Sequence, residues 1–306
     1  MSASESIATK HIGPWTWTRA STQVLIYAAL LTWAFICLFP IYWTFSTSFK
    51  TAVNVTQGHI IPFTAQFPGD WKGWRSLGLS PDTFFETSTV RDEFMRRFLN
   101  SAIASIGASF LALLIGAPAA YGLARFRYKF GPWRNKDISF FFLSQLLLPP
   151  VVLAMPFLVL YKQLALLDNM VGLILVYTLM VLPIVIWITR DQFETIPVEL
   201  EQAALVDGCT VWTAFFRIVL PIALPGLVAA FILSIVLCWN EYFFAALLTG
   251  TNARTLPVMV ASQTGSQGIS WWSMAALSSA AILPLVLVGI FLERYIVKGL
   301  TAGAVK

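Results

Sequence analysis

The sequence is poor in charge. Only 11% of its 306 residues are Asp, Glu, Lys or Arg, whereas 58% are hydrophobic, and the mean hydropathy is +0.74. Soluble domains carry about 25% charged residues. A chain this apolar cannot cover a water-facing surface with polar groups, so the composition predicts an integral membrane protein.

Cysteine and histidine are also scarce. The chain has three cysteines, Cys37, Cys209 and Cys238, and no two of them form a C-x-x-C pair. His11 and His59 have no partner at ligand spacing. We therefore expect neither a disulfide framework nor a metal site.

Several motifs are missing. The first 22 residues lack the short apolar core and cleavage site of a signal peptide. No P-loop of the form G-x-x-x-x-G-K-[ST], no G-x-S-x-G and no H-E-x-x-H occurs. Glu241 is the only clear acid inside an apolar run, so no cluster of titratable groups indicates an enzyme. The chain is expected to bind no cofactor and not to hydrolyse ATP itself.

Six long apolar runs make up much of the sequence. Each is long enough to cross a hydrocarbon core of about 30 Å as a helix, and none alternates in the way a barrel strand does. They lie near residues 23–46, 98–123, 138–161, 170–189, 220–248 and 273–297. The fold class expected is all-α with six transmembrane helices, consisting of a tail over residues 1–22 and one membrane domain over residues 23–306.

Basic residues in the short loops predict the orientation. The densest group follows the second run and consists of Arg125, Arg127, Lys129, Arg134 and Lys136. Positively charged short loops stay in the cytoplasm, so an even number of crossings places both termini there as well. The net charge of +5 is explained by this orientation, and no nucleic-acid partner is expected. The long segment 47–97 is expected outside, as a partly folded cap with one or two short helices.

Prolines recur within the apolar runs. Each removes a backbone donor and tends to kink its helix. The prolines concerned are Pro118, Pro149, Pro150, Pro156, Pro183, Pro221, Pro225 and Pro284.

The loop between the fourth and fifth runs, residues 191–219, has a helix–turn–helix pattern. Pro197 is acceptable in a first helical turn, and Glu199 and Glu201 suit the positive N-terminal end. Gly208 permits the left-handed conformation that ends a helix. Thr210 can cap the next helix.

The same loop carries a surface suited to another protein. Ala203 and Ala204 leave a smooth face that a partner can approach closely. Trp212, Phe215 and Phe216 form an apolar face too large to leave in water without a partner or a membrane surface.

At this loop the sequence resembles the permease subunits of binding-protein-dependent ABC importers. The family pattern is EAA-x3-G-x9-I-x-L-P, which is matched by Gln202, Ala203, Ala204, Gly208, Ile218, Leu220 and Pro221. One position departs, because Gln202 stands where the pattern has Glu, although Glu201 lies beside it. The departure affects the ionic role of that position and not the helix–turn–helix shape.

The resemblance extends along nearly the whole chain. Pro40–Tyr42, Asn100–Ser101 and Tyr121–Arg125 resemble the family, and Trp239–Glu241 is similar to its carbohydrate-uptake branch, the maltose-permease type. The resemblance implies the type I importer permease fold, a second and different permease subunit, two ATPase subunits that bind ATP and Mg, and an external solute-binding protein. It also implies a bacterial or archaeal inner-membrane location.

In that family the cytoplasmic loop docks in a cleft of the ATPase as a coupling helix. The resemblance therefore implies ATPase-coupling roles for Glu201, Gln202, Ala203, Ala204, Asp207, Gly208, Trp212 and Phe215.

Polar groups at membrane depth mark the candidate solute path, since a charge at the centre of a span costs about 2.5–3.5 kcal/mol on insertion scales. Asn240 and Glu241 are the clearest polar pair, flanked by the aromatic residues Trp239 and Tyr242, which can stack on sugar rings. Gln145 lies in the middle of the third run and is a further candidate. A helix–helix hydrogen bond is an alternative role for Gln145.

The function expected is translocation of a sugar or sugar derivative through the bilayer. An importer for amino acids, peptides or anions is an alternative, and so is an ion-coupled secondary transporter. The secondary transporter would show repeat symmetry between the halves of the chain, and none is visible.

Overall fold

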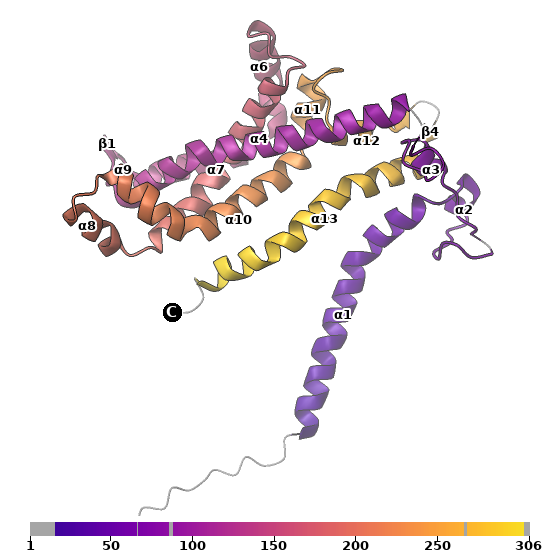
Figure 1. Cartoon of the computed structure of the whole chain (residues 1–306), viewed down its shortest axis with the longest axis horizontal. Helices are drawn as coiled ribbons and strands as arrows, with labels where there is room; N and C mark the ends of the chain where they lie inside the picture. The colour runs from indigo at the N-terminus through magenta and orange to yellow at the C-terminus, as the bar shows by residue number, and fades with distance from the viewer. Residues whose placement is uncertain (1–15, 66, 86–87, 266–267, 303–306) are drawn as a thin grey trace, which may run out of the picture.

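The computed structural model describes residues 16–65, 67–85, 88–265 and 268–302, and it is built almost entirely of helices (Figure 1). In chain order the elements are α1 (Thr16–Thr47), α2 (Ala52–Thr56), α3 (Lys72–Arg75), α4 (Thr89–Arg125), β1 (Lys129–Phe130), β2 (Trp133–Arg134), α5 (Asn135–Ser144), the 3₁₀ turn η1 (Gln145–Leu147), α6 (Pro150–Gln163), α7 (Met170–Glu194), α8 (Val198–Val206), α9 (Val211–Ala214), the π-helical turn η2 (Phe215–Val219), α10 (Leu220–Trp239), α11 (Phe243–Leu248), α12 (Leu256–Ala261), β3 (Thr264–Gly265), β4 (Gly268–Ile269) and α13 (Trp271–Ala302).

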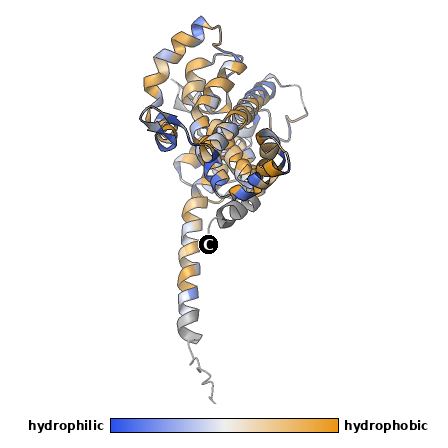
Figure 2. Ribbon diagram, turned by 90° about the vertical axis from the view of Figure 1, so that its left-hand side faces the viewer, coloured by the Kyte–Doolittle hydropathy of each residue, from blue (hydrophilic) through white to orange (hydrophobic). Residues whose placement is uncertain are grey.

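Five of the described helices are long and apolar enough to cross a membrane: Ser21–Thr47, Thr89–Arg125, Met170–Glu194, Val211–Trp239 and Trp271–Ile290. A sixth span is present if α5–η1 and α6 are taken as one broken span. The apolar character of these helices is visible along their length (Figure 2). The prediction of an all-α membrane protein with about six spans is confirmed. Of the predicted tail, residues 1–15 lie outside the described residues.

The helices α4, α7 and α10 form the core. Along one face of α4, every fourth residue is small and buried, at Ala104, Ala108, Ala112 and Gly116. A Cβ atom added at Gly116 would lie 2.9 Å from Cγ1 of Val185 on α7. Small residues at this spacing let two helix backbones approach closely, which is the main source of packing energy between helices in lipid.

The third predicted span, 138–161, is wrong as a single helix. The helical axis turns by 90° between η1 and α6, where Pro149 and Pro150 follow each other. Leu148 is extended, as the residue before a proline prefers, and neither proline can donate a backbone hydrogen bond. By contrast, Pro118 and Pro183 lie inside continuous helices.

The fifth predicted span, 220–248, is also interrupted. Helix α10 ends at Trp239 and α11 begins at Phe243. The residues between them, Asn240–Tyr242, leave the helical path, and they are three of the five residues predicted to contact the solute. At its other end α10 continues through η2 into α9, so this rod begins earlier than predicted, at Val211.

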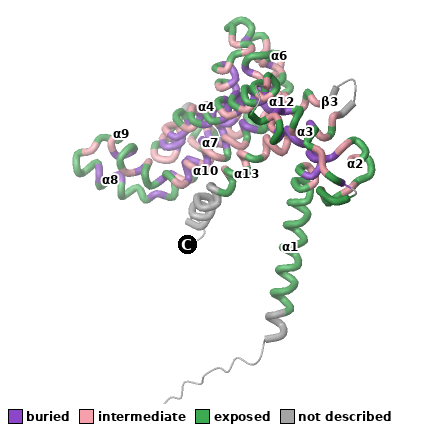
Figure 3. Tube along the Cα trace, turned by 45° about the vertical axis from the view of Figure 1, so that its right-hand side comes forward, coloured by how far each residue is buried: buried purple, intermediate pink, exposed green. Residues whose placement is uncertain are grey.

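Helix α1 stands apart from the core. It meets α13 near the cap and then diverges from the bundle (Figure 1), and its apolar residues are exposed along most of its length (Figure 3). An apolar helix this exposed needs lipid or another membrane subunit around it.

The segment between α1 and α4 forms a cap that contains two short helices, α2 and α3. The indole Nε1 of Trp74 donates to Oγ of Ser48 at 3.0 Å, and Oγ of Ser76 donates to Oγ of Ser273 at 2.9 Å. The cap therefore ties the end of α1 to the start of α13. It is shorter than predicted, because α4 begins at Thr89.

Candidate functional site: coupling loop and solute path

The predicted coupling loop, residues 191–219, has the expected helix–turn–helix form. Gly208 adopts φ +86°, and the N–H of Cys209 donates to the carbonyl of Ala204 at 2.9 Å, which closes α8. Oγ1 of Thr210 accepts the N–H of Thr213 at 3.2 Å and caps α9. Two short helices thus meet at Gly208, because glycine adopts the left-handed turn conformation without the strain that a Cβ atom brings.

One face of this loop is exposed. Val206 is 87% exposed and Trp212 is 63% exposed, and Gln202, Ala203 and Asp207 are exposed beside them. Apolar groups of this size rarely remain in water unless a partner covers them.

Phe215 does not belong to that face, which corrects the expectation for this residue. Its side chain is only 1% exposed and lies in a core cluster, with its ring centroid 4.6 Å from that of Tyr121 and 6.0 Å from that of Phe193. Ala204 is buried as well. These two residues support the loop from within.

Glu201 is buried and points into the protein. Its Oε1 accepts Nε of Arg125 at 2.5 Å, and its Oε2 accepts the hydroxyl of Tyr121 at 2.7 Å. Arg125 also donates to the carbonyl of Ile196 at 2.8 Å. The sequence drew attention to Tyr121–Arg125 and to Glu201 separately. Only the tertiary structure shows that Tyr121, Arg125 and Glu201 form one hydrogen-bond network.

A continuous helical rod connects the predicted coupling loop to the residues predicted to contact the solute. Helix α9 runs through the π-helical turn η2 into α10, and α10 ends at Trp239, next to Asn240. Single π-helical turns inside α-helices occur frequently at functional sites. The loop of residues 191–219 and the residues predicted to contact the solute thus lie at opposite ends of one continuous helical rod.

A cavity of about 570 Å³ lies at the end of α10, between α12 and α13. Its lining includes Trp239, Asn240 and Tyr242. The indole Nε1 of Trp239 donates to the carbonyl of Ala281 on α13 at 3.2 Å, and Nδ2 of Asn240 donates to the carbonyl of Val236 at 2.8 Å. The opposite wall is formed by Pro257, Val260, Ala261, Met274, Ser278, Ala281, Ile282 and Leu285.

Glu241 is placed differently from its neighbours. Its carboxylate accepts the N–H groups of Phe244 at 2.8 Å and Ala245 at 3.1 Å, which caps α11. Its carbonyl accepts the hydroxyl of Tyr177 at 3.3 Å. Gln145 lies in η1 and is exposed; it is not part of the lining of this cavity. The structure thus brings three of the five predicted solute residues into one cavity.

The loop between α11 and α12 is held by groups that the sequence did not point to. The Asp168 carboxylate accepts the backbone N–H groups of four consecutive residues, Gly250, Thr251, Asn252 and Ala253, at 2.8–3.1 Å. Burial opposes ionisation of Asp168, but these hydrogen bonds outweigh it and lower the pKa to about 2.

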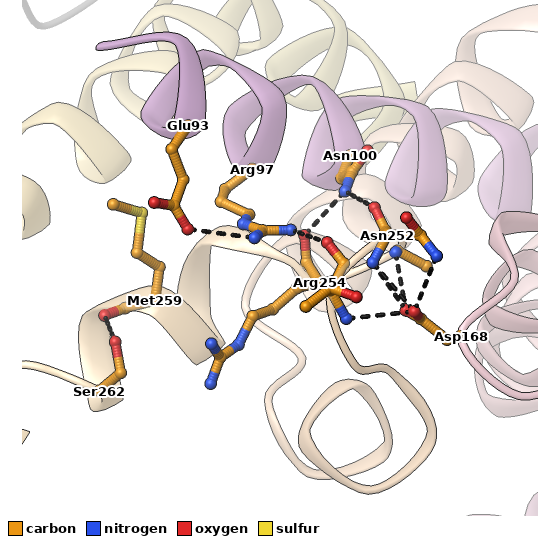
Figure 4. Close-up of polar contacts among 10 residues, drawn as sticks. Glu93, Arg97, Asn100, Asp168, Asn252, Arg254, Met259 and Ser262 are labelled. Carbon is orange, nitrogen blue, oxygen red and sulfur yellow. Dashed lines mark hydrogen bonds and ion pairs between the residues drawn. The ribbon is translucent and has the colours of Figure 1, made fainter. Parts of the chain in front are cut away.

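Helix α4 holds the same loop from the other side (Figure 4). Nδ2 of Asn100 donates to the carbonyls of Asn252 at 2.7 Å and Arg254 at 2.9 Å. Arg97 donates to the carbonyl of Thr251 and pairs with Glu93 at 3.1 Å. Asn100 lies inside α4 and fixes this loop. The loop in turn positions α12, which lines the cavity. Within the described residues, no three His, Cys, Asp or Glu side chains converge as a metal site requires.

The chain is similar to several curated transport proteins along most of its length. It is 31% identical over 286 residues to the diacetylchitobiose uptake system permease protein DasC of Streptomyces coelicolor, covering 93% of this chain and 95% of the relative. It is 33% identical to the trehalose transport system permease protein SugB of Mycobacterium tuberculosis, with coverage of 95% and 97%. The sulfoquinovosyl glycerol transport system permease protein SmoH of Agrobacterium fabrum is 32% identical, with coverage of 88% and 89%.

Solved structures share the fold. A chain of a bacterial ABC transporter involved in the import of the acidic polysaccharide alginate superposes with a TM-score of 0.68 at 20% identity, covering 91% of this chain and 97% of that one. An inward-facing MetNI methionine ABC transporter gives 0.54 at 16% identity, with coverage of 70% and 99%. Residues 112–302 match the model of a family described as the binding-protein-dependent transport system inner membrane component. The chain belongs to this family, and it is therefore a multi-pass permease component of an ABC importer rather than an enzyme.

Proposed function

We propose that this permease subunit imports a sugar or sugar derivative that an external solute-binding protein delivers. The observation that carries the proposal is the similarity, over nearly the full chain, to permeases named for diacetylchitobiose, trehalose and sulfoquinovosyl glycerol. A solved alginate importer of the same fold, in complex with a pentasaccharide-bound periplasmic protein, supports delivery by a binding protein.

The chemistry of the cavity suits such a solute. Trp239 and Tyr242 supply aromatic surface, and Asn240 and Ser278 supply neutral groups that can both donate and accept hydrogen bonds. Sugar rings present apolar faces and hydroxyl edges, and a mixed lining of this kind matches both. Glu241 stays a candidate for solute contact, and its carboxylate also caps α11 at the break between α10 and α11.

The coupling loop supports ATP-driven operation. Its exposed face, Val206, Trp212 and their neighbours, fits a cleft in a cytoplasmic ATPase, while Glu201 and Phe215 anchor the loop to the core. Two ATPase subunits would bind ATP and Mg. Closure of the ATPases would push on the loop, and the rod from α9 to α10 would carry the displacement to Asn240.

A second permease subunit would complete the path. The exposed face of α1 supports this, as does an apolar cavity of about 650 Å³ between α1, α4 and α13. We place the complex in the inner membrane of a bacterium or archaeon, with both termini and the coupling loop in the cytoplasm.

The test is purification of the tagged full chain from its own membranes in mild detergent, followed by reconstitution of the complex in vesicles. We expect an ATPase and a second permease to co-purify. With the binding protein outside, ATP inside should drive uptake of trehalose or diacetylchitobiose as radiolabelled probes. A complex that hydrolyses ATP but accumulates methionine and no sugar from a broad panel would overturn the carbohydrate assignment. A chain that purifies without any ATPase after crosslinking would overturn the coupling role.

A further inference from the structure

A short hairpin at the end of α4 carries four unpaired cations. Strands β1 and β2 are flanked by Arg127 and Lys136 and contain Lys129 and Arg134, and all four side chains are exposed. No ion pair in the described part of the chain involves any of the four. The adjacent acid, Asp137, accepts the backbone N–H of Arg134 at 2.8 Å.

The hairpin register places two of these cations against each other. Lys129 pairs with Arg134 across the antiparallel strands, so both side chains project from the same face. Residues directly opposite in such a pair have Cβ atoms about 4.5–5.5 Å apart, and like charges there destabilise the hairpin. An anion bound between the two side chains removes that repulsion.

The hairpin is fixed where the apolar part of α4 ends. Oδ1 of Asn135 accepts the N–H of Tyr128 at 2.7 Å, and its Nδ2 donates to the carbonyls of Leu123 at 2.8 Å and Phe126 at 2.6 Å. Because Arg125, the last residue of α4, pairs with Glu201, the hairpin lies at the same end of the molecule as the coupling loop.

Beside the cations lies an apolar surface. The ring centroid of Trp133 lies 6.1 Å from that of Phe141 on α5 in an edge-on contact, and Trp133 and Phe140 are both exposed. Tryptophan side chains concentrate at the boundary between headgroups and acyl chains. A groove of about 400 Å³ at this place is lined by Pro132, Trp133, Asp137, Phe140, Phe141 and Ser144.

We propose that the β1–β2 hairpin binds the headgroup of an anionic phospholipid in the membrane leaflet on the coupling-loop side. Lys129 and Arg134 would hold the phosphate between them, Arg127 and Lys136 would add to the positive field, and the groove beside Trp133 would accept the glycerol and upper acyl chain. A cationic cluster directly beyond a span, with an aromatic residue at the interface, fits the chemistry of an anionic lipid surface. This site is separate from the solute path and does not depend on which solute is carried.

The experiment is native mass spectrometry of the full chain in detergent, titrated with dioleoylphosphatidylglycerol or, in parallel, with dioleoylphosphatidylcholine. We expect the wild type to retain the anionic lipid more tightly. The variant K129Q/R134Q should bind the first phosphatidylglycerol about 30-fold more weakly, about fivefold for each cation removed, with unchanged binding of phosphatidylcholine. The matched control is R96Q/K162Q, which removes one exposed Arg and one exposed Lys outside the hairpin.

Three results would overturn the proposal: equal retention of the two lipids by the wild type, unchanged retention of phosphatidylglycerol by K129Q/R134Q, or an equal loss in R96Q/K162Q. A hairpin variant that keeps its lipid but no longer co-purifies with an ATPase would assign the cations to a protein contact instead. All four substituted side chains are exposed, so thermal unfolding of both variants in phosphatidylcholine should match the wild type and show that they fold.

Discussion

Glu201 and Arg125 form a buried ion pair, with Oε1 and Nε 2.5 Å apart and side chains only 9% and 8% exposed. The pair joins α8 of the coupling loop to the end of α4. Since Tyr121 occupies the second carboxylate oxygen, Glu201 is engaged on both sides. The coupling loop is thus fastened to a core helix as well as being continuous with α10.

Replacing Glu201 with Ala should destabilise the protein and weaken coupling. Breaking a buried pair by removing one partner costs about 3–5 kcal/mol, because the remaining charge stays buried without compensation. We expect a lower thermal midpoint and less solute transported per ATP hydrolysed by the reconstituted complex. The double variant R125A/E201A should lose less than the sum of the two single variants. The control is E199Q, at an exposed residue of the same helix; identical behaviour of E201A and E199Q would contradict the anchoring role.

Gly208 gives a second test, in which only the backbone is changed. A Cβ atom at this position meets no atom within 4 Å, but φ is +86°, so any penalty comes from the left-handed conformation, at about 1–2 kcal/mol for a residue with a Cβ atom. We expect uncoupled ATP hydrolysis to rise in the order Gly, Asn, Ala, Val, because Asn tolerates this conformation and a β-branched residue does not. Normal coupled uptake by Gly208→Val would count against the assignment of the coupling loop.

The coupling loop could be predicted from sequence because its determinants are local. A proline at the start, a glycine at the turn and Thr210 at the next cap each act within a few residues. The orientation of the loop could not be predicted. Neighbouring helical positions point about 100° apart, so the sequence does not show whether Glu201 or Gln202 faces the core. The structure turns Glu201 inward and leaves Gln202 exposed.

The cavity at the end of α10 was predictable only in part, for a similar reason. Asn240 could be singled out because it is a polar residue within an apolar run. The sequence did not show whether its neighbour Glu241 lines the cavity or caps a helix, because that depends on where α10 ends. In the structure Glu241 caps α11. Apolar run length predicted a continuous third span, whereas consecutive prolines broke it. The hydrogen bonds from the loop residues Gly250–Ala253 to Asp168, which we call the Asp168 clamp, join residues about 80 positions apart in the chain. No local sequence pattern could have predicted them.

Asn240 should affect transport without affecting stability. Among the described residues its side-chain amide bonds only to Val236 of its own helix, so Asn240→Ala removes a cavity-facing group at small structural cost. We expect a higher KM for solute in vesicle uptake at an unchanged thermal midpoint. Glu241→Ala should lower the thermal midpoint, because the N-terminal N–H groups of α11 lose their acceptors. Gln145→Ala, outside the cavity, should leave KM unchanged; a change there equal to that of Asn240→Ala would relocate the solute path.

Asp168 should make the stability of the α11–α12 loop depend on pH only in strong acid. Its pKa is lowered from 3.8 to about 2, so its stabilising contribution is complete well above pH 3.8, declines as the pH falls and is lost below about pH 2. Thermal unfolding in detergent should therefore respond to Asp168→Asn strongly at neutral pH and progressively less toward pH 2. The exposed Asp191→Asn serves as the control for a carboxylate elsewhere on the surface.

Loss of the clamp should also expose the loop. Thr251 is an exposed loop residue, so a cysteine placed there reports on the backbone around it, in a background with Cys37→Ser and Cys209→Ser. With Asp168→Asn, four loop N–H groups face an amide that can offer only one oxygen, and the contacts from Asn100 and Arg97 on α4 are left to hold the loop. We expect faster reaction of the cysteine with a polar maleimide and a higher KM for solute, because α12 no longer holds the cavity wall. Faster labelling with an unchanged KM would separate the loop from the solute path, and unchanged labelling would show that Asn100 and Arg97 hold the loop without Asp168.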